Sequence, residues 1–351
     1  MRSMQINSFR TASWFVVAIL LGSASVTNHA RAQAAGAFAR MGFGARGVAM
    51  SNALVADAFT DGAPYYNPAL SPFASGQSIE ASTALMSLDR ELQFLQFATA
   101  LEPNAGIAAG LIHAGVANID GRDNSGYHTR DYSIDEFAFF LAFGTHISKR
   151  LTAGVGLQLF RASFFEALEP VNSIGIDLGL TYLATDELRL GLAVDDLLAR
   201  YSWDTSDLYG SEGTSTSDRF PVRIRFGGAL RLFEGRAQVT AEYESQITST
   251  DNRSRNVEIV GDRPQEVLTS SRSQMHDSIF RLGSEYRLAD IFTLRGGVDR
   301  IGTDSFDGMT PTGGFMVDQP IGPLIARAEY AFMLEPYGVG AMHLITLRIF
   351  L

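Results

Sequence analysis

Residues 220–232 read FPVRIRFGGALRL, and their side chains alternate between two faces. One face carries only apolar residues and glycine, whereas the other carries Arg223, Arg225 and Arg231. A period of two residues is typical of a β-strand whose faces meet different surroundings. An arginine that faces lipid in the middle of a bilayer costs about 2–4 kcal/mol. If this strand crosses a membrane, its arginines therefore point away from the lipid.

The same period continues along the chain from about Gln77 to the C-terminus. It defines fourteen segments, near 77–86, 91–101, 105–118, 135–146, 151–163, 172–184, 187–197, 220–232, 236–247, 277–288, 291–301, 312–321, 324–334 and 341–351. Connections after even-numbered segments are short, such as Thr185–Asp186, and the two longest of the others, 198–219 and 248–276, are polar. An even strand number with short turns at one end is typical of outer-membrane barrels. The predicted fold is all-β, a transmembrane antiparallel β-barrel of fourteen strands over residues 77–351.

The N-terminus carries the features of a secretory signal peptide, which we assign to residues 1–32. Arg2 and Arg10 precede the apolar run Trp14–Gly22, and Ala30-Arg31-Ala32 offers a cleavage site. The run is too short to span a bilayer as a helix, and an uncleaved anchor is the alternative. We therefore expect the protein in a bacterial outer membrane, with membrane lipid, lipopolysaccharide and the barrel assembly machinery as partners.

The composition argues against several functional classes. The chain has no cysteine, so neither disulfides nor thiolate metal sites are expected. It has 28 basic and 38 acidic side chains, and the signal peptide holds three of the bases and no acid, which leaves a formal charge of −13. Nucleic acid is not expected to bind so acidic a chain. No hydrolase, zinc-protease or P-loop motif is present, and the run 120–126 is only loosely similar to a calcium loop, so we predict no enzyme activity, cofactor or metal.

Charged side chains recur on one face of neighbouring predicted strands, and we expect this face to line the barrel lumen. Both signs are present, so a lattice of salt bridges is favoured over a charge-selective pore. The predicted network consists of Arg223, Arg225, Arg231, Glu242, Glu244, Arg281, Glu285, Arg295, Asp299, Arg327, Glu329 and Arg348.

Residues 33–76 precede the first predicted strand and are rich in small side chains. Within them, residues 42–47 match the dinucleotide-binding pattern G-x-G-x-x-G, but no β-branched strand precedes the glycines. We therefore expect no cofactor loop here. Glycine and alanine allow a backbone to approach neighbouring strands closely, so we interpret the segment as packed inside the barrel. A disordered N-terminal tail is the alternative.

This segment also resembles the N-terminal signature of the PorV/PorQ family. The runs 44–50, 53–58 and 65–70 carry the resemblance, although Leu70 stands where the family usually has a glycine. The resemblance implies a fourteen-stranded barrel, related to the FadL long-chain fatty-acid transporters, with residues 33–76 as a hatch in the lumen. The hatch-motif residues that it identifies are Gly42, Gly44, Arg46, Gly47, Met50, Tyr65, Tyr66, Asn67, Pro68 and Ala69.

Three functions follow from this resemblance and from the barrel. A protein similar to PorV would handle exported cargo together with secretion-system components. A protein similar to FadL would transport long-chain fatty acids or other hydrophobic small molecules. A nonspecific diffusion porin is the third possibility. Because inward charges argue against a continuous apolar conduit, we expect a hydrophobic ligand site only in the outer third, at Phe160, Phe164, Phe165, Tyr201, Trp203 and Leu208.

Overall fold

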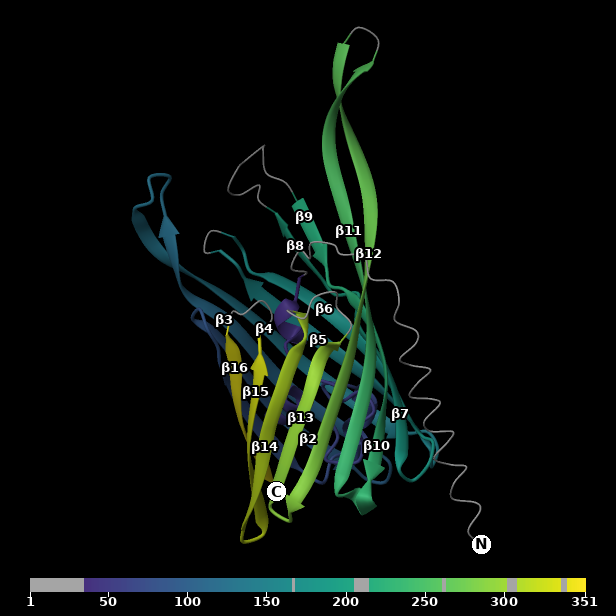
Figure 1. Cartoon of the computed structure of the whole chain (residues 1–351). Coiled ribbons are helices and arrows are strands. Elements are labelled where there is room, and N and C mark those ends of the chain that lie inside the picture. Colours follow the sequence, from purple (N-terminus) through teal and green to yellow (C-terminus); the bar gives the residue numbers. More distant parts are fainter. Residues whose placement is uncertain (1–34, 166–167, 205–214, 261–262, 302–307, 336–339) are drawn as a thin grey trace.

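The computed structural model describes residues 35–351, apart from 166–167, 205–214, 261–262, 302–307 and 336–339. Fourteen strands form one closed barrel in which every neighbouring pair is antiparallel (Figure 1). The ring closes where β1 (Ser78–Leu85) pairs with β16 (Ala341–Phe350). The predicted fourteen-stranded antiparallel barrel is confirmed.

The remaining strands follow the chain around the ring, with one insertion. The other barrel strands are β2 (Arg90–Leu101), β3 (Ala105–Arg122), β4 (His128–His146), β5 (Leu151–Ser163), β6 (Val171–Leu183), β7 (Leu188–Leu197), β10 (Val222–Leu232), β11 (Ala237–Val260), β12 (Arg263–Ala289), β13 (Phe292–Ile301), β14 (Thr310–Ile321) and β15 (Leu324–Leu334). Between β7 and β10, β8 (Arg200–Asp204) and β9 (Ser215–Arg219) form a separate two-stranded sheet. The short turn η4 (Phe233–Gly235) joins β10 to β11.

Several strands continue into segments that we expected to be loops. The loop predicted over 248–276 is instead a long ribbon, because β11 and β12 stay paired as far as Val260 and Arg263 (Figure 1). β3 and β4 also run past their predicted ends, and β8 and β9 lie within the expected loop 198–219. A two-stranded ribbon satisfies the backbone hydrogen bonds along its paired edge, so even polar sequences can continue as strand. We call the end with these hairpins the loop end and the opposite end the turn end.

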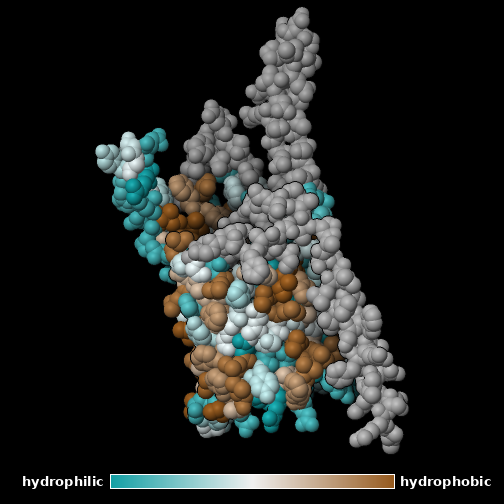
Figure 2. Space-filling view, in the orientation of Figure 1, coloured by the Kyte–Doolittle hydropathy of each residue, from teal (hydrophilic) through white to brown (hydrophobic). Residues whose placement is uncertain are grey.

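The barrel wall has one apolar and one polar face. In β10, Ile224 and Phe226 are 39% and 44% exposed on the outside, whereas Arg223 and Arg225 are buried. Many apolar side chains lie on the outer wall, and hydrophilic ones gather at its turn end and on the projecting β3–β4 hairpin (Figure 2). The arginines that the alternation placed away from lipid thus face the lumen.

Among the described residues, three short helical turns precede β1, namely η1 (Ala37–Arg40), α2 (Ala45–Ala49) and η2 (Pro68–Phe73). α2 contacts β13–β16, whereas η2 contacts β2–β6 on the other side of the ring. Because residues 35–76 touch strands around a closed barrel, they lie in its lumen, where Figure 1 shows them in purple. We call these residues the luminal segment. The predicted signal peptide, 1–32, lies outside the described residues. None of the described helices has the length and apolar character needed to cross a membrane.

Candidate functional site

The luminal segment packs directly on inward-facing glycines of the barrel wall. A Cβ atom at Gly144 of β4 would lie 2.7 Å from the Pro68 carbonyl oxygen, and one at Gly283 of β12 would lie 2.6 Å from the Met50 carbonyl oxygen. Only glycine leaves room for so close an approach. The inward glycines that meet the segment in this way also include Gly106, Gly154, Gly179, Gly191 and Gly297.

Tyr66, a residue of the predicted hatch motif, ties the first half of the luminal segment together. Its hydroxyl accepts a hydrogen bond from the Phe43 backbone N–H at 2.9 Å and donates one to Asn52 Oδ1 at 2.7 Å. The same hydroxyl lies so close to Gly47 that any side chain there would collide with it. The glycine of the motif is therefore explained by packing inside the barrel rather than by a cofactor phosphate.

Asn67 and Pro68 organise the second half of the segment. The Asn67 side chain caps η2 by accepting from the Ala69 N–H at 3.0 Å, and it donates to the Val55 carbonyl at 2.7 Å. Pro68 occupies the first position of η2, where its missing N–H costs nothing. The other predicted motif residues are also placed in the segment: Gly42 and Gly44 have positive φ, Met50 is buried, and Tyr65 donates to the Ala39 carbonyl.

Charged groups attach the segment to one side of the barrel. The Arg46 guanidinium pairs with Asp57 within the segment and lies 3.3 Å from Glu285 on β12. In return, Glu242 on β11 accepts a hydrogen bond from the Val55 N–H at 3.0 Å. Arg225 on β10 donates to the Tyr66 carbonyl. The segment therefore shares its polar contacts with the wall.

We call the inward faces of β7 and β10–β16 the ionic wall. Arg281 lies 2.6 Å from Glu244, 3.3 Å from Glu242 and 2.8 Å from Asp299. Arg295 lies 3.0 Å from both Glu285 and Glu329. Further ion pairs join Arg223 to Asp196, Arg225 to Asp195, Arg327 to Asp318 and Asp61, and Arg348 to Glu80. The predicted inward charges thus meet in ion pairs, in one group around Arg281 and another around Arg295, with one exception.

Arg231 is the exception, and its assignment to the network was wrong. It lies at the turn end of β10, where it is exposed to solvent and its guanidinium sits 5.1 Å from the centre of the Phe59 ring. The alternation predicts which face of the strand a residue lies on, but not whether it lies inside the barrel or near the end of the strand. The prediction named five acids that do pair with arginines, but it missed others. Asp195 shares the inward face of its strand, so its position could have been predicted, whereas Asp57 and Asp61 lie in the luminal segment, where no period applies.

The opposite side of the lumen is lined mainly by apolar side chains. We call the inward faces of β2–β5 the apolar wall. Phe94 and Phe140 stack with ring centres 6.1 Å apart, and Phe43 and Tyr65 of the luminal segment pack on them at 5.4 Å and 5.2 Å. These rings belong to one buried hydrophobic cluster, which includes Phe160 at the loop end. The premise that inward charges interrupt any apolar path through the lumen was therefore wrong, because charge is concentrated on one half of the ring. The position of a ligand site in the outer third stays a prediction.

Five aromatic side chains form what we call the mouth cluster: Phe160, Phe164, Tyr201, Trp203 and Phe220. The Phe164 ring lies 5.7 Å from Tyr201 and 5.9 Å from Trp203, and Phe220 lies 4.9 Å from Tyr201 and 4.7 Å from Phe160. Tyr201 and Phe160 are buried, whereas Phe164 remains 36% exposed. The cluster thus leads from solvent at the loop end to the buried apolar core.

The structure unites most of the predicted ligand residues and adds others. Phe165 lies beside the mouth cluster, stacked on Tyr132 at 5.5 Å, and Leu208 lies outside the described residues. Phe220 was missed because the predicted strand 220–232 placed it on the apolar outer face, whereas β10 begins only at Val222. Phe38 of the luminal segment, 6.3 Å from Phe160, was missed because the contact is distant in sequence.

Two small cavities lie beside the luminal segment. One of about 30 Å³ lies near Tyr66, Glu80 and Phe94, and another of about 20 Å³ lies near Tyr66 and Arg225. Cavities of this size hold about one water molecule each. In the arrangement described, a ligand larger than water passes only if side chains or the segment move.

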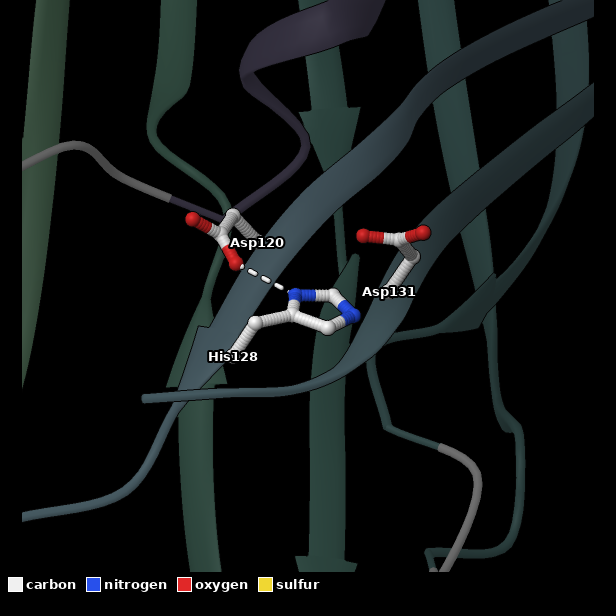
Figure 3. A group of neighbouring side chains, drawn as sticks. All are labelled: Asp120, His128 and Asp131. Atoms are coloured by element: carbon white, nitrogen blue, oxygen red, sulfur yellow. Dashed lines mark hydrogen bonds and ion pairs between the residues drawn. The ribbon is translucent and has the colours of Figure 1, made fainter. Parts of the chain in front are cut away.

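A separate polar group lies on the β3–β4 hairpin, outside the barrel (Figure 3). Asp120, His128 and Asp131 offer ligand atoms within 4.8 Å of one another, and His128 Nδ1 lies 2.7 Å from Asp120 Oδ1. This hydrogen bond raises the pKa of His128 and lowers the pKa of Asp120. Arg122 also pairs with Asp120. Because two basic side chains already bind Asp120 and all three residues are exposed, we assign no metal to this group.

Solved structures of membrane channels resemble this chain over most of its length. The toluene transporter TodX of Pseudomonas putida aligns with a TM-score of 0.57 and 16% identity, covering 88% of this chain and 97% of TodX. The monoaromatic hydrocarbon channel CymD aligns with a TM-score of 0.54 and 13% identity, covering 88% of this chain and 96% of CymD. A FadL homologue of Pseudomonas aeruginosa aligns with a TM-score of 0.54 and 12% identity, covering 87% of this chain and 97% of the homologue. The sequence matches no family model and no curated protein. At these identities the likeness establishes a shared FadL-like barrel fold.

Proposed function

We propose that this protein is an outer-membrane channel that binds hydrophobic small molecules at the mouth cluster and passes them along the apolar wall. The observation that carries the proposal is the continuous apolar cluster, which begins with exposed rings at the loop end and reaches deep into the lumen. The FadL-like fold, shared with the toluene transporter TodX and the hydrocarbon channel CymD, supports the same function.

The two walls have different roles in this proposed function. An aromatic or aliphatic ligand gains by leaving water for the exposed ring of Phe164 and the half-buried ring of Trp203. Further passage requires the rings packed on the apolar wall, such as Phe43 and Tyr65, to give way. The ionic wall meanwhile holds the luminal segment through Arg46 and Glu242. In this proposal residues 33–76 act as a hatch, residues 77–351 form the conduit, and no enzymatic step is involved.

The location and orientation are part of the proposal. The outward apolar band suits a bilayer, with the loop end outside the cell and the short connections in the periplasm. Residues 1–32 would direct export and be removed, and lipopolysaccharide and the barrel assembly machinery would be the partners of the outer wall.

A PorV/PorQ-type role with secretion components is the competing proposal. The sequence motif supports it, but Gly47, Tyr66 and Asn67 are engaged in folding the luminal segment. A transporter needs the same packing, so the motif does not favour cargo handling over small-molecule transport. The aromatic mouth favours the small-molecule channel.

Uptake of a hydrophobic aromatic probe tests the proposed function. We expect cells that carry the protein to accumulate radiolabelled toluene faster than cells without it, and Phe160→Ala together with Tyr201→Ala to reduce that gain at least tenfold. The matched control is Leu159→Ala, which removes the outward-facing neighbour of Phe160 and should leave uptake unchanged. Equal uptake by the double variant and the wild-type protein would rule out the mouth cluster as the binding site.

Conductance in planar bilayers separates this channel from a diffusion porin. Because the luminal segment packs on both walls and the two cavities described beside it are water-sized, we expect little steady ionic current from the intact protein. A large, constant current would favour the porin instead.

A further inference from the structure

Glu136 is a carboxylate placed among the aromatic rings of the mouth. It belongs to the inward face of β4, since it pairs with buried Ala162 of β5 and has the same parity as buried Ala138 and Phe140. It is half-buried. The position could have been predicted from the alternation of segment 135–146, but the sequence did not indicate its surroundings.

The hydrogen bonding of Glu136 differs from that of the other inward acids. Acids of the ionic wall meet arginines at 2.6–3.0 Å, as Glu244, Glu329 and Asp299 do. Among the described residues, the partner of Glu136 is the Tyr201 hydroxyl, which donates to Oε1 over 3.4 Å. That distance is long for an O–H···O hydrogen bond. The nearby cation that acts on Glu136 is Arg40, whose guanidinium also donates to the Ala35 carbonyl at 3.1 Å.

A carboxylate accepts several hydrogen bonds, so Glu136 has acceptor capacity left beside apolar rings. An aromatic ligand with an O–H group can fill this capacity while its ring packs on Phe164 or Trp203. A hydrocarbon of the same shape would displace water from the carboxylate without donating a hydrogen bond to it. A ligand that carries its own carboxylate would bring a like charge to the same place.

We propose that Glu136 makes the mouth cluster selective for uncharged aromatic molecules that bear a hydrogen-bond donor, such as phenols and aryl alcohols. This inference rests on the proposed channel function and specifies its ligand class. Hydrocarbons bind more weakly at this site, and aromatic or fatty carboxylates are excluded from it.

Three ligands of nearly equal shape test the selectivity on the purified full-length protein in detergent. They are p-cresol, toluene and p-toluate, which differ only in a hydroxyl, a hydrogen or a carboxylate on the same methylated ring. Binding can be followed by isothermal titration. For the wild-type protein we expect p-cresol to bind about 10- to 100-fold more tightly than toluene, and p-toluate to show no binding.

Two substitutions at Glu136 assign the effect to its carboxylate. Glu136→Leu should reduce the ratio of p-cresol to toluene affinity to about one while toluene still binds. Glu136→Gln keeps an acceptor oxygen and removes the charge, so it should retain the preference for p-cresol and admit p-toluate. Glu187→Gln, at an exposed residue of the turn end, is the matched control and should behave as wild type. Retained heat-modifiable migration on gels shows that each variant is folded.

The outcomes separate this inference from the channel function. If the wild-type protein binds toluene as tightly as p-cresol, or if Glu136→Leu keeps the preference, the selectivity is wrong and the channel function stands. If none of the three ligands binds to folded wild-type protein, the mouth cluster is not a small-molecule site and both proposals fail.

Discussion

The two halves of the lumen wall hold the same luminal segment in different ways. The ionic wall holds it through charged pairs such as Glu285 with Arg46, at 3.3 Å, and Arg327 with Asp61, which fix both distance and direction. The apolar wall uses stacked rings at 5–6 Å, which give cohesion without a single preferred register. The difference teaches that one chain segment can be anchored on one side of a barrel and remain displaceable on the other. A hydrophobic ligand would then pass on the displaceable side.

The largest effect is expected where the ionic wall is broken. Arg281→Met leaves Glu242, Glu244 and Asp299 with buried charges and no common partner, so we expect a loss of about 3–5 kcal/mol in the free energy of unfolding. Urea denaturation of refolded protein in detergent measures this loss. Arg122→Met removes an exposed ion pair and should cost less than about 1 kcal/mol. If both variants lose equally little, the ion pairs of the ionic wall do not stabilise the folded barrel.

A smaller effect is expected where the wall touches the segment through glycine. A Cβ at Gly297 would lie 2.5 Å from the Leu282 carbonyl oxygen and 3.2 Å from the Met50 carbonyl carbon, so Gly297→Ala should cost about 1–3 kcal/mol. Its neighbour Gly296 has no such contact nearer than 3.7 Å, and Gly296→Ala should change stability by less than about 0.5 kcal/mol. The same denaturation assay compares this pair. Equal costs would mean that the luminal segment does not pack on the wall as described.

The apolar wall should tolerate a conservative change better than the ionic wall does. Phe140→Leu keeps an apolar side chain of similar size next to Tyr65, so we expect a cost below about 1.5 kcal/mol and continued protection of the luminal segment. Limited proteolysis within residues 35–76 reports the protection, and Phe139→Leu on the outward face is the matched control. If Phe140→Leu exposes the segment as much as Arg281→Met does, the proposed contrast between the walls is wrong.

Much of the barrel could be predicted from the sequence because its physics is local. The period of two in segments such as 220–232 gives the strands, and the cost of arginine in lipid gives their inward face. Strand ends are set less locally. β11 and β12 continue through a Ser- and Thr-rich stretch because their backbones hydrogen-bond to each other. The sequence of either strand alone does not indicate this pairing.

The candidate site could be predicted only in part. Phe164, Tyr201 and Trp203 are concentrated near the loop end in the sequence, and the structure unites them. The division of the lumen into two walls could not be predicted, because it depends on which strands close the ring. Phe38 reaches Phe160 from the luminal segment, where no period constrains side chains.

The smallest effect concerns the β3–β4 hairpin, outside both walls. The carboxylate of Asp120 accepts a hydrogen bond from His128 and raises the pKa of His128 above its ordinary value, so Asp120→Asn should lower that pKa. Asp131→Asn should lower it less, because Asp131 acts through its charge alone and Figure 3 shows no hydrogen bond to it. Titration of the His128 ring resonances measures both shifts.

The direction of the pH dependence follows from these pKa values. Since the folded-state pKa of His128 is raised, its contribution to hairpin stability is fully present below the unfolded-state pKa and is lost as the pH rises through the folded-state pKa. The lowered pKa of Asp120 adds a contribution that is present above its unfolded-state pKa and lost in acid. The hairpin should therefore be most protected from proteolysis between these two limits. Both side chains are exposed, so salt should weaken the effect, whereas the ion pairs inside the barrel should respond little to salt.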